Sequence, residues 1–476
     1  MANPKVGLLP LYLELYDKSL PQLHAKIQSF YDTIAGELEK RGLDVVRVPI
    51  CRVSHEFESA VEKIEASGAD CVVTLHLAYS PSLESAHVLS ATQLPIVVLD
   101  TTPTFDFSPS QNPAEIMFNH GIHGVQDMCN LLIRNGKRFG IEAGHWEKSD
   151  VLDRVVSWCR AAHAAKNIRT ARIGLIGGAF NGMGDFAVST DVLRSTIGVE
   201  TVQCNVNVLR SLVPASNDPV VEAEMAEDRS RFAAQGVNDD AHRATTCAGI
   251  AVRRWIEAER LTGFSFNFLS LDKASGLPTV PFMEAGKAMA RGKGYAGEGD
   301  VLTAALVGAL ASIYPETTFT EMFCPDWENE SVFLSHMGEM NLDLAGEKPV
   351  LMEKDFPWTD AGNPVIAAER FKAGDAALVN LAPGPGDTYS LIISPVEMLG
   401  DSGEDCMPET IRGWFRPSLP LTDFLAEYSR FGGTHHLALV YGAAAGDIRK
   451  LGDIMGWKVV ILDRAKSAGC IIDEVE

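Results

Sequence analysis

Four short segments of the sequence carry acidic or histidine side chains among small and aromatic neighbours, where solvation alone does not explain them. The first three contain Glu298, Glu321 and His336, and the last contains the adjacent pair His435 and His436. The segments span residues 294–300, 317–323, 334–337 and 431–436. Two carboxylates with one or two imidazoles form a mixed oxygen and nitrogen donor set that suits Mn²⁺, Co²⁺, Fe²⁺ or Zn²⁺. The combination indicates a divalent-metal site with open positions for a substrate.

Each segment also has a plainer interpretation when it is taken alone. A glutamate between glycines, such as Glu298, is typical of a solvated turn. His336 is equally typical of a core histidine that a backbone carbonyl satisfies, and a His-His pair can cap a strand. The metal interpretation therefore depends on the four segments acting together.

In their order along the chain, the four segments resemble the L-arabinose isomerase family. The chain carries the family's AGEGD loop at residues 296–300, a glutamate in a Thr- and Phe-containing stretch at 317–323, an SHM triplet at 335–337 and the pattern Gly-Gly-x-His-His at 432–436. The resemblance implies that a divalent ion is bound by four side chains, which are Glu298, Glu321, His336 and His436. It also implies that the two glutamates serve as acid and base, and which of them is the base stays open.

This donor set suits the interconversion of an aldose and a ketose. Moving a proton between adjacent carbons produces an enediol or enediolate, which is stabilised only while the neighbouring carbonyl is polarised, and a divalent ion supplies that polarisation. One carboxylate can move the proton between C2 and C1 while the other handles hydroxyl protons. The resemblance implies Mn²⁺ as the ion, with Co²⁺ or Mg²⁺ as alternatives.

Weaker similarity to the family extends over most of the chain. It includes a Gly-His-Trp triplet at residues 144–146 and the segment 119–124, which resembles a histidine segment that in the family reaches toward a neighbouring subunit's active site. The resemblance implies a homo-oligomer of three or six subunits. It makes four residues candidates for binding the sugar, which are Tyr12, His120, His123 and His435. For His123, a histidine at the start of a helix is the alternative.

The sequence departs from the family at positions expected to face the substrate. Residues 9–14 stand where the family has a GSQHLYG-like run, His120 replaces a glutamine, and residues 322–327 replace a more polar DYTYHF run. Sites that hydrogen-bond hydroxyl groups discriminate strongly between sugars, so such changes can redirect specificity. We therefore expect the isomerase chemistry to be retained with a sugar that need not be L-arabinose. Other pentoses, deoxyhexoses, hexoses and shorter polyhydroxy carbonyl compounds are open.

The elements that must position these residues follow two different patterns. Up to about residue 315, short apolar runs such as 71–75 and 96–99 alternate with amphipathic stretches, and the runs lack a clean polar alternation. This predicts parallel sheets that are covered by helices on both faces. After residue 315, strand-like segments separated by Pro, Gly and Asp dominate, and one short helical pattern stands at 446–455.

We therefore expect an α/β protein with two open doubly wound parallel-sheet domains, followed by a mostly antiparallel β domain. The predicted domains are residues 1–167, 168–315 and 316–476. A chain of 476 residues exceeds the size of a single hydrophobic core, which agrees with more than one domain.

The amino-acid composition limits the classes of partner that the protein can bind. A formal net charge of −22 argues against a nucleic-acid partner, because such proteins gain most of their affinity from clustered Lys and Arg. The start of the sequence lacks a signal-peptide pattern, and no apolar run approaches the length that spans a bilayer. We expect a cytoplasmic protein with a small-molecule sugar substrate and no membrane or nucleic-acid partner.

Two other functions compete with this interpretation. The glycine-rich stretch 174–184 follows a strand-like run and could be the dinucleotide-binding turn of an oxidoreductase. Its glycines do not fall in GxGxxG register, however, and no clear acidic residue closes a second strand about twenty residues later. A non-catalytic sugar-binding protein is the second alternative, since hinge-type binders also consist of open α/β domains. A pure binder would not need both carboxylates and both histidines.

Overall fold

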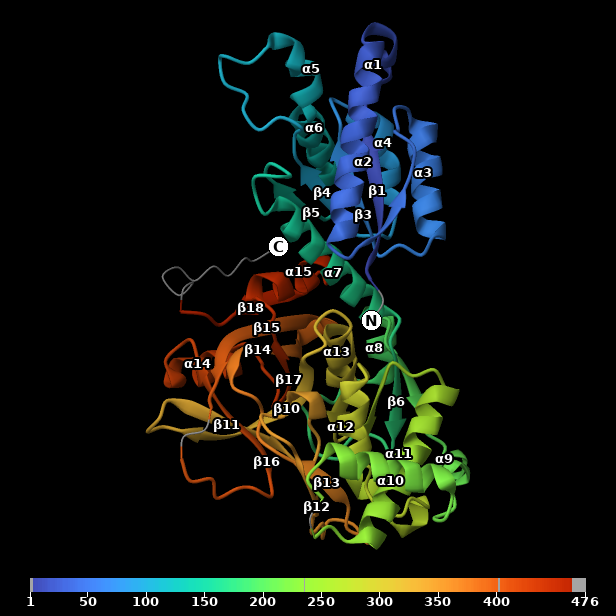
Figure 1. The fold of residues 1–476 in the computed structure, drawn as a ribbon, viewed down its shortest axis with the longest axis vertical. Helices are drawn as coiled ribbons and strands as arrows, with labels where there is room; N and C mark the ends of the chain where they lie inside the picture. The colour runs from blue at the N-terminus through green and yellow to red at the C-terminus, as the bar shows by residue number, and fades with distance from the viewer. Residues whose placement is uncertain (1–2, 235, 401–402, 465–476) are drawn as a thin grey trace. The chain divides into compact units, whose positions relative to one another are not determined.

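The computed structural model describes residues 3–234, 236–400 and 403–464 (Figure 1). The chain forms two compact units, residues 1–166 and residues 167–476. Among the described residues, no helix combines the length and the apolar character needed to cross a bilayer.

The first unit is built on a five-stranded parallel sheet in the order β2-β1-β3-β4-β5. All six residues of β3 are buried, as expected for a strand with both faces covered. One of these faces packs on α3, α4 and α6 through a shared apolar cluster. The strands are β1 (Lys5–Leu11), β2 (Asp44–Arg47), β3 (Cys71–His76), β4 (Ile96–Asp100) and β5 (Phe139–Ala143). The helices are α1 (Glu14–Ser19), α2 (His24–Lys40), α3 (Ser54–Ala66), α4 (Ser82–Ala91), α5 (Ile116–Asn119), α6 (Gly121–Arg134) and α7 (Val151–Arg169).

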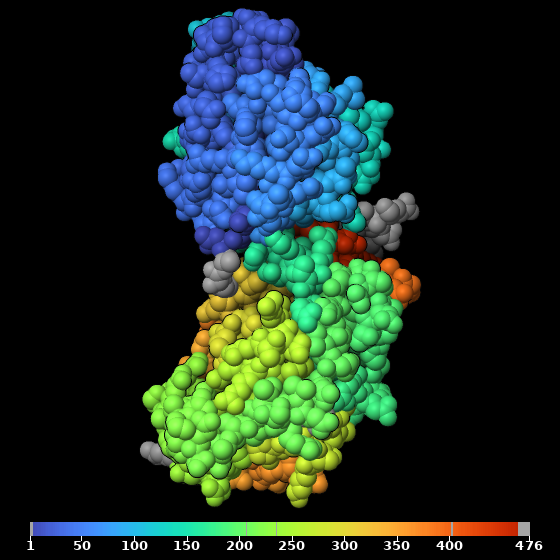
Figure 2. Space-filling view, turned by 90° about the vertical axis from the view of Figure 1, so that its right-hand side faces the viewer, coloured from blue at the N-terminus to red at the C-terminus, as the bar shows by residue number. Residues whose placement is uncertain are grey.

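The second unit begins with a four-stranded parallel sheet in the order β7-β6-β8-β9. Residues of this part, green to yellow in Figure 2, cover most of the face of the second unit that the view shows. Its strands are β6 (Arg172–Ile176), β7 (Glu200–Gln203), β8 (Gly263–Phe266) and β9 (Gly294–Gly297). Its helices are α8 (Thr190–Thr196), α9 (Val206–Leu212), α10 (Pro219–Arg231), α11 (Asp239–Ala258), α12 (Phe282–Ala290) and α13 (Val301–Ala311).

The rest of the second unit forms an antiparallel barrel. Its strands pair in the order β14-β17-β10-β11-β16-β15, and β15 pairs back with β14, so the ring closes and these strands have no open sheet edge at the closure. The parallel strand β18 adds to the free part of β15. The strands are β10 (Thr317–Asp326), β11 (Ser331–His336), β14 (Gly374–Pro383), β15 (Tyr389–Met398), β16 (Ile411–Pro417), β17 (His436–Tyr441) and β18 (Lys458–Ile461). A separate hairpin of β12 (Val350–Glu353) and β13 (Val365–Ala368) accompanies helices α14 (Leu421–Arg430) and α15 (Ala445–Met455).

The predicted fold class is confirmed by these sheets: two parallel and helix-covered, then one mostly antiparallel. We expected one helix in the β region, and the structure has two, α14 and α15. The unexpected helix α14 buries Leu421, Phe424 and Tyr428 on its apolar face. The division of the second unit near residue 315 stays a prediction.

Helix α13 belongs to both parts of the second unit. It packs against β9 and also against the barrel strands β10, β14 and β17 (Figure 1). Its sequence, VLTAALVGALA, is apolar on every side, and nearly all of its residues are buried. The helix runs very close to β9, because a Cβ on Gly294 would come within 2.1 Å of the Ala304 carbonyl oxygen. The parallel sheet and the barrel therefore share one core element.

Candidate metal centre

Strand pairing in the barrel brings three of the predicted ligands together. Glu321 on β10 lies opposite His436 on the neighbouring strand β17 and opposite Ser335 on the other neighbour, β11. His336 is the residue after Ser335 and ends β11. Glu298 comes from the parallel sheet, in the loop between β9 and α13. Residues separated by up to 138 positions thus meet where α13 begins.

The side chains of these four residues face one another. Glu298 Oε2 lies 3.5 Å from His436 Nε2, and Glu321 Oε2 lies 3.9 Å from His336 Nε2. Two sets of three side chains each have ligand atoms within 4.8 Å of one another, and the sets share His436. The first set adds Glu298 and His435, and the second adds Glu321 and His336. Such spacing is what a single cation bridging the groups requires.

Each of the two buried histidines is oriented by a carboxylate behind it. His336 Nδ1 donates to Glu339 Oε2 at 2.7 Å, and His436 Nδ1 donates to Asp300 Oδ2 at 3.0 Å. Since an ionised carboxylate only accepts, these bonds place a proton on Nδ1 and turn Nε2 toward the other side chains of the group. Carboxylate partners of this kind are the usual support of metal-binding histidines.

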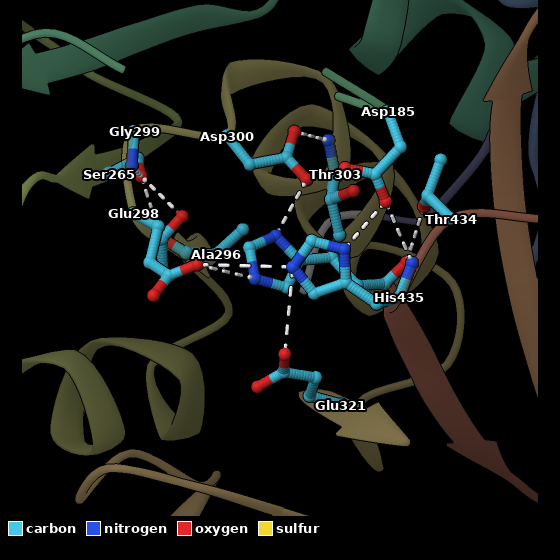
Figure 3. Close-up of polar contacts among 12 residues, drawn as sticks. Asp185, Ser265, Ala296, Glu298, Gly299, Asp300, Thr303, Glu321, Thr434 and His435 are labelled. Carbon is cyan, nitrogen blue, oxygen red and sulfur yellow. Dashed lines mark hydrogen bonds and ion pairs between the residues drawn. The ribbon is translucent and has the colours of Figure 1, made fainter. Parts of the chain in front are cut away.

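The supporting carboxylates are themselves held in place. Glu339 accepts a hydrogen bond of 2.6 Å from the Tyr295 hydroxyl. Asp300 is the N-cap of α13, where its Oδ1 accepts from the backbone N–H of Thr303 at 2.9 Å (Figure 3). The start of α13 and the orientation of His436 therefore depend on the same side chain.

Two atoms at the centre test whether a cation fits. Glu298 Oε2 and His436 Nε2 are buried and, apart from facing each other at 3.5 Å, have no hydrogen-bond partner among the described residues. Buried polar atoms without a partner are costly and rare, and a bound ion is one of the few arrangements that satisfies a carboxylate oxygen and an imidazole nitrogen together. The donor set and these orphaned atoms both fit a divalent cation.

Without a cation, the close approach of these side chains shifts the pKa values of Glu298 and His436. Burial opposes charge on Glu298, but His435 and His436 outweigh it and lower the pKa of Glu298 to about 2. Burial likewise opposes charge on His436, but hydrogen bonding to Asp300 and the proximity of Glu298 raise its pKa to about 9. A proton thus occupies His436 where a cation would bind, and cation binding should release it.

Local backbone geometry explains the glycines on either side of Glu298. Glu298 has φ of 61°, a left-handed conformation that side chains rarely adopt. A Cβ on Gly297 would lie 2.6 Å from His336 Cε1, so the strand must be bare where the imidazole packs on it. Gly299 has φ of +85°, and its Cβ would meet the Gly178 carbonyl oxygen at 2.4 Å. Glycine is thus needed on both sides of Glu298 for the loop to hold this side chain in place.

His435, predicted to bind substrate, lies beside the predicted metal ligands. Its Nε2 is 3.5 Å from Glu321 Oε1 and 3.9 Å from Glu298 Oε2 (Figure 3). Its side chain is 31% exposed, whereas the side chains of His336 and His436 are 3% and 0% exposed. It is therefore the histidine of this group that faces outward.

The other predicted sugar-binding residues gather in the first unit. The Tyr16 hydroxyl lies 3.0 Å from His120 Nε2, and the rings of His120 and His123 meet edge to face with centroids 5.7 Å apart. The ring of Tyr12 is buried and stands edge to face with that of Tyr16. The three residues do form one cluster with Tyr16, and their contact with a sugar stays a prediction.

Several functional neighbours were not predicted from the sequence. Glu339 lies three residues after His336 and Asp300 two residues after Glu298, so both were within reach of a search for carboxylates near the ligand motifs. Asp185, which accepts from His435 Nδ1 at 2.6 Å, is 250 residues away from it and carries no local signal.

Comparisons with known proteins agree with these motifs. Sequence models of the L-arabinose isomerase N-terminal, central and C-terminal domains match residues 13–170, 188–314 and 316–458. The chain is 25% identical to the L-arabinose isomerase of Herpetosiphon aurantiacus, over 93% of this chain and 91% of that protein. It is 22% identical to that of Geobacillus thermodenitrificans, over 94% and 93%. A periplasmic solute-binding protein of Actinobacillus succinogenes with bound D-allose covers 65% of this chain at 14% identity, with a TM-score of 0.17 that is too low to indicate a shared fold.

Proposed function

Because the chain belongs to the L-arabinose isomerase family and is an aldose–ketose isomerase, we propose that its activity depends on a divalent cation held in the second unit. The proposed ligands are Glu298, Glu321, His336 and His436. The observation that carries the proposal is the orphaned pair at the centre, Glu298 Oε2 and His436 Nε2. We propose Mn²⁺ as the ion, with Co²⁺ and Mg²⁺ as alternatives, because mixed carboxylate and imidazole ligands suit such cations.

The two glutamates divide the proton transfers in this proposal. The cation, when bound, polarises the sugar carbonyl and so makes the neighbouring C–H bond more acidic. One carboxylate removes the proton from C2 of the open-chain aldose and delivers it to C1, so that the enediol becomes the ketose. The second carboxylate carries a proton from the C2 hydroxyl to the C1 carbonyl oxygen, which keeps protons and charge balanced. Glu298 comes from the loop after β9 and Glu321 from β10, and both lie close to His435 Nε2. Either glutamate can therefore be the one that moves the C2 proton.

The sugar itself is proposed only as a class. Polyhydroxy aldehydes whose open-chain form presents adjacent oxygens fit a site with two carboxylates and an outward-facing imidazole. The family membership further supports a cytoplasmic homo-oligomer of three or six subunits, in which Tyr12, His120 and His123 contact the sugar.

A panel of sugars tests the proposal. Aldopentoses, aldohexoses and deoxyhexoses would be incubated with chelator-treated protein that is reloaded with Mn²⁺, Co²⁺ or Mg²⁺, and ketose formation would be measured. We expect conversion of at least one sugar, and its loss in chelator. No conversion of any sugar with any ion would contradict the proposal.

A charge-neutral substitution separates catalysis from sugar binding. Glu298→Gln should lower turnover by about 10²–10⁴-fold, since it removes a group that transfers protons or holds the ion. Glu227→Gln, an exposed glutamate on α10, is the control and should leave turnover unchanged. A non-catalytic sugar binder would show the same ligand affinity in both variants and no turnover in either.

A further inference from the structure

The glycine-rich loop after β6 is not built to receive a dinucleotide. No helix follows it directly, because α8 begins only at Thr190. The backbone N–H of Phe180 donates to the Glu298 carbonyl oxygen at 2.8 Å, and the Asn267 side chain donates to the Ala179 carbonyl oxygen at 3.2 Å. The loop, residues 177–186, is therefore attached along its first half to the segment that carries Glu298.

The second half of the same loop reaches the histidine pair. Asp185 Oδ2 accepts two hydrogen bonds from His435, one from the backbone N–H at 3.1 Å and one from Nδ1 at 2.6 Å (Figure 3). The next residue, Phe186, stacks on His436 with ring centroids 4.8 Å apart and an interplanar angle of 14°. Phe186 is buried, which fixes the end of the loop against β17.

We propose that Asp185 is a positioning residue for His435, an inference that rests on the proposed isomerase function. Two bonds to one carboxylate oxygen fix both the backbone and the ring of His435, and they keep the proton on Nδ1. The ring is held so that Nε2 is directed at the space beside Glu321 Oε1 and Glu298 Oε2. A ring nitrogen at that place can form a hydrogen bond with a sugar hydroxyl.

Burial distinguishes His435 from the metal-binding histidines in this proposal. The carboxylate–histidine pairs of His336 and His436 are closed to solvent, whereas the His435 side chain is 31% exposed and that of Asp185 is 35% exposed. A partly exposed imidazole beside a buried ion site is suited to a ligand that comes and goes. We therefore assign His435 Nε2 to the sugar and its orientation to Asp185.

Kinetics of the Mn²⁺-loaded enzyme test the assignment. Asp185→Ala should raise KM about 10–100-fold with little change in kcat, because a contact present in both the bound substrate and the transition state is lost. Asp185→Asn keeps an oxygen acceptor and should have a smaller effect. The control Asp191→Ala changes an exposed aspartate in α8 and should leave both constants unchanged. An unchanged KM in Asp185→Ala would overturn the assignment.

Two further measurements exclude a merely structural or metal-binding role. The melting temperature and the Mn²⁺ affinity by calorimetry should be the same in Asp185→Ala and wild type. A fall in Mn²⁺ affinity would overturn the proposal by making His435 an ion ligand. The double variant Asp185→Ala/His435→Ala should be no worse than His435→Ala alone, since Asp185 acts through His435. Multiplying effects would overturn it as well.

A readout without turnover keeps this proposal separate from the isomerase proposal. In ¹⁵N-histidine-labelled, Mg²⁺-loaded protein, the His435 resonances, identified by their absence in His435→Ala, should show a hydrogen-bonded proton on Nδ1. Asp185→Ala should shift the Nδ1 signal. If no sugar is converted but this shift is seen, the isomerase proposal fails while Asp185 still positions His435. If the wild type lacks the Nδ1 proton, the positioning role fails whatever the activity.

Discussion

Two buried groups of charged side chains in the second unit differ in how their charges are matched. The first lies among α10, α11 and α12 and pairs every acid with a base. Arg253 forms a two-pronged contact with Glu224 at 2.7 and 2.9 Å and also reaches Glu284 at 2.6 Å. Lys287 contacts Glu224 at 2.6 Å, as well as Asp228, and Arg291 contacts Glu284. Three acidic side chains face three Lys and Arg side chains, and the His242 imidazole also contacts Asp228 at 3.0 Å, so no acid of this group is left unmatched.

The candidate metal centre, in contrast, has more acids than its histidines can neutralise. Its five carboxylates belong to Asp185, Glu298, Asp300, Glu321 and Glu339. They face three imidazoles, and Lys354 also acts on Glu339, so one negative charge would remain even if all four bases were protonated. Buried charge alone therefore does not indicate a binding site. Unmatched charge, together with orphaned atoms, does.

The largest expected difference is in stability without a cation. Glu284→Gln should lower the free energy of unfolding by about 3–5 kcal/mol, because Arg253 and Arg291 lose a carboxylate that is 1% exposed. Glu321→Gln should not lower it, since the variant removes one of the unmatched charges. Urea denaturation in chelator measures both. Equal losses would show that the two groups are alike.

The pH dependence of stability should differ in sign between Glu224 of the first group and His436 of the second. Burial opposes charge on Glu224, but Arg253 and Lys287 outweigh it and lower the pKa of Glu224 to about 2. Because this pKa is depressed, the stabilisation is present above the ordinary value of 4.5 and is lost as the pH falls toward about 2, a loss of about 3 kcal/mol. For His436 the pKa is raised to about 9, so its contribution is present below 6.5 and is lost as the pH rises through about 9.

Denaturation curves of ion-free protein across this pH range check the two signs. Glu224→Gln should flatten the acid side of the stability profile and leave the alkaline side unchanged. His436→Gln should flatten the alkaline side and, because His436 helps to lower the pKa of Glu298, should also change the acid side. A change on the alkaline side in Glu224→Gln would mean that the two groups are coupled.

The smallest expected effect distinguishes the groups by their response to a cation. Mn²⁺ at about a hundredfold excess over its Kd should raise the free energy of unfolding by about 2.7 kcal/mol, since it binds only the folded protein. His336→Gln should abolish the increase, and Glu284→Gln should retain it on a lower baseline. Thermal or urea unfolding with and without Mn²⁺ provides the measurement. An increase that persists in His336→Gln would place the ion elsewhere.

The sequence predicted the fold class, and it singled out the four proposed ligands, because both depend on local patterns. Glu298, Glu321, His336 and His436 each stand in a short motif, and the buried runs of the parallel strands lack polar alternation. The barrel closure was not predictable, because it depends on β14 pairing with both β15 and β17, partners up to 65 residues apart. Asp185 escaped for the same reason, since its partner is a single contact far along the chain. Helix α14 did carry a signal, an apolar spacing at Leu421, Phe424 and Tyr428.

Helix α13 has a consequence for anyone who would divide or recombine this chain. A cut between residues 315 and 316 falls at the join between two matched domain models, yet it separates Glu298 and Asp300 from the residues that complete the centre, Glu321, His336 and His436. It also strips the barrel strands from one side of a helix that has no polar face to offer water. Neither fragment would keep the complete site or the complete core. In a chimera with a distant relative joined there, the α13 of one parent would have to pack against the barrel strands of the other before the ligand set could assemble.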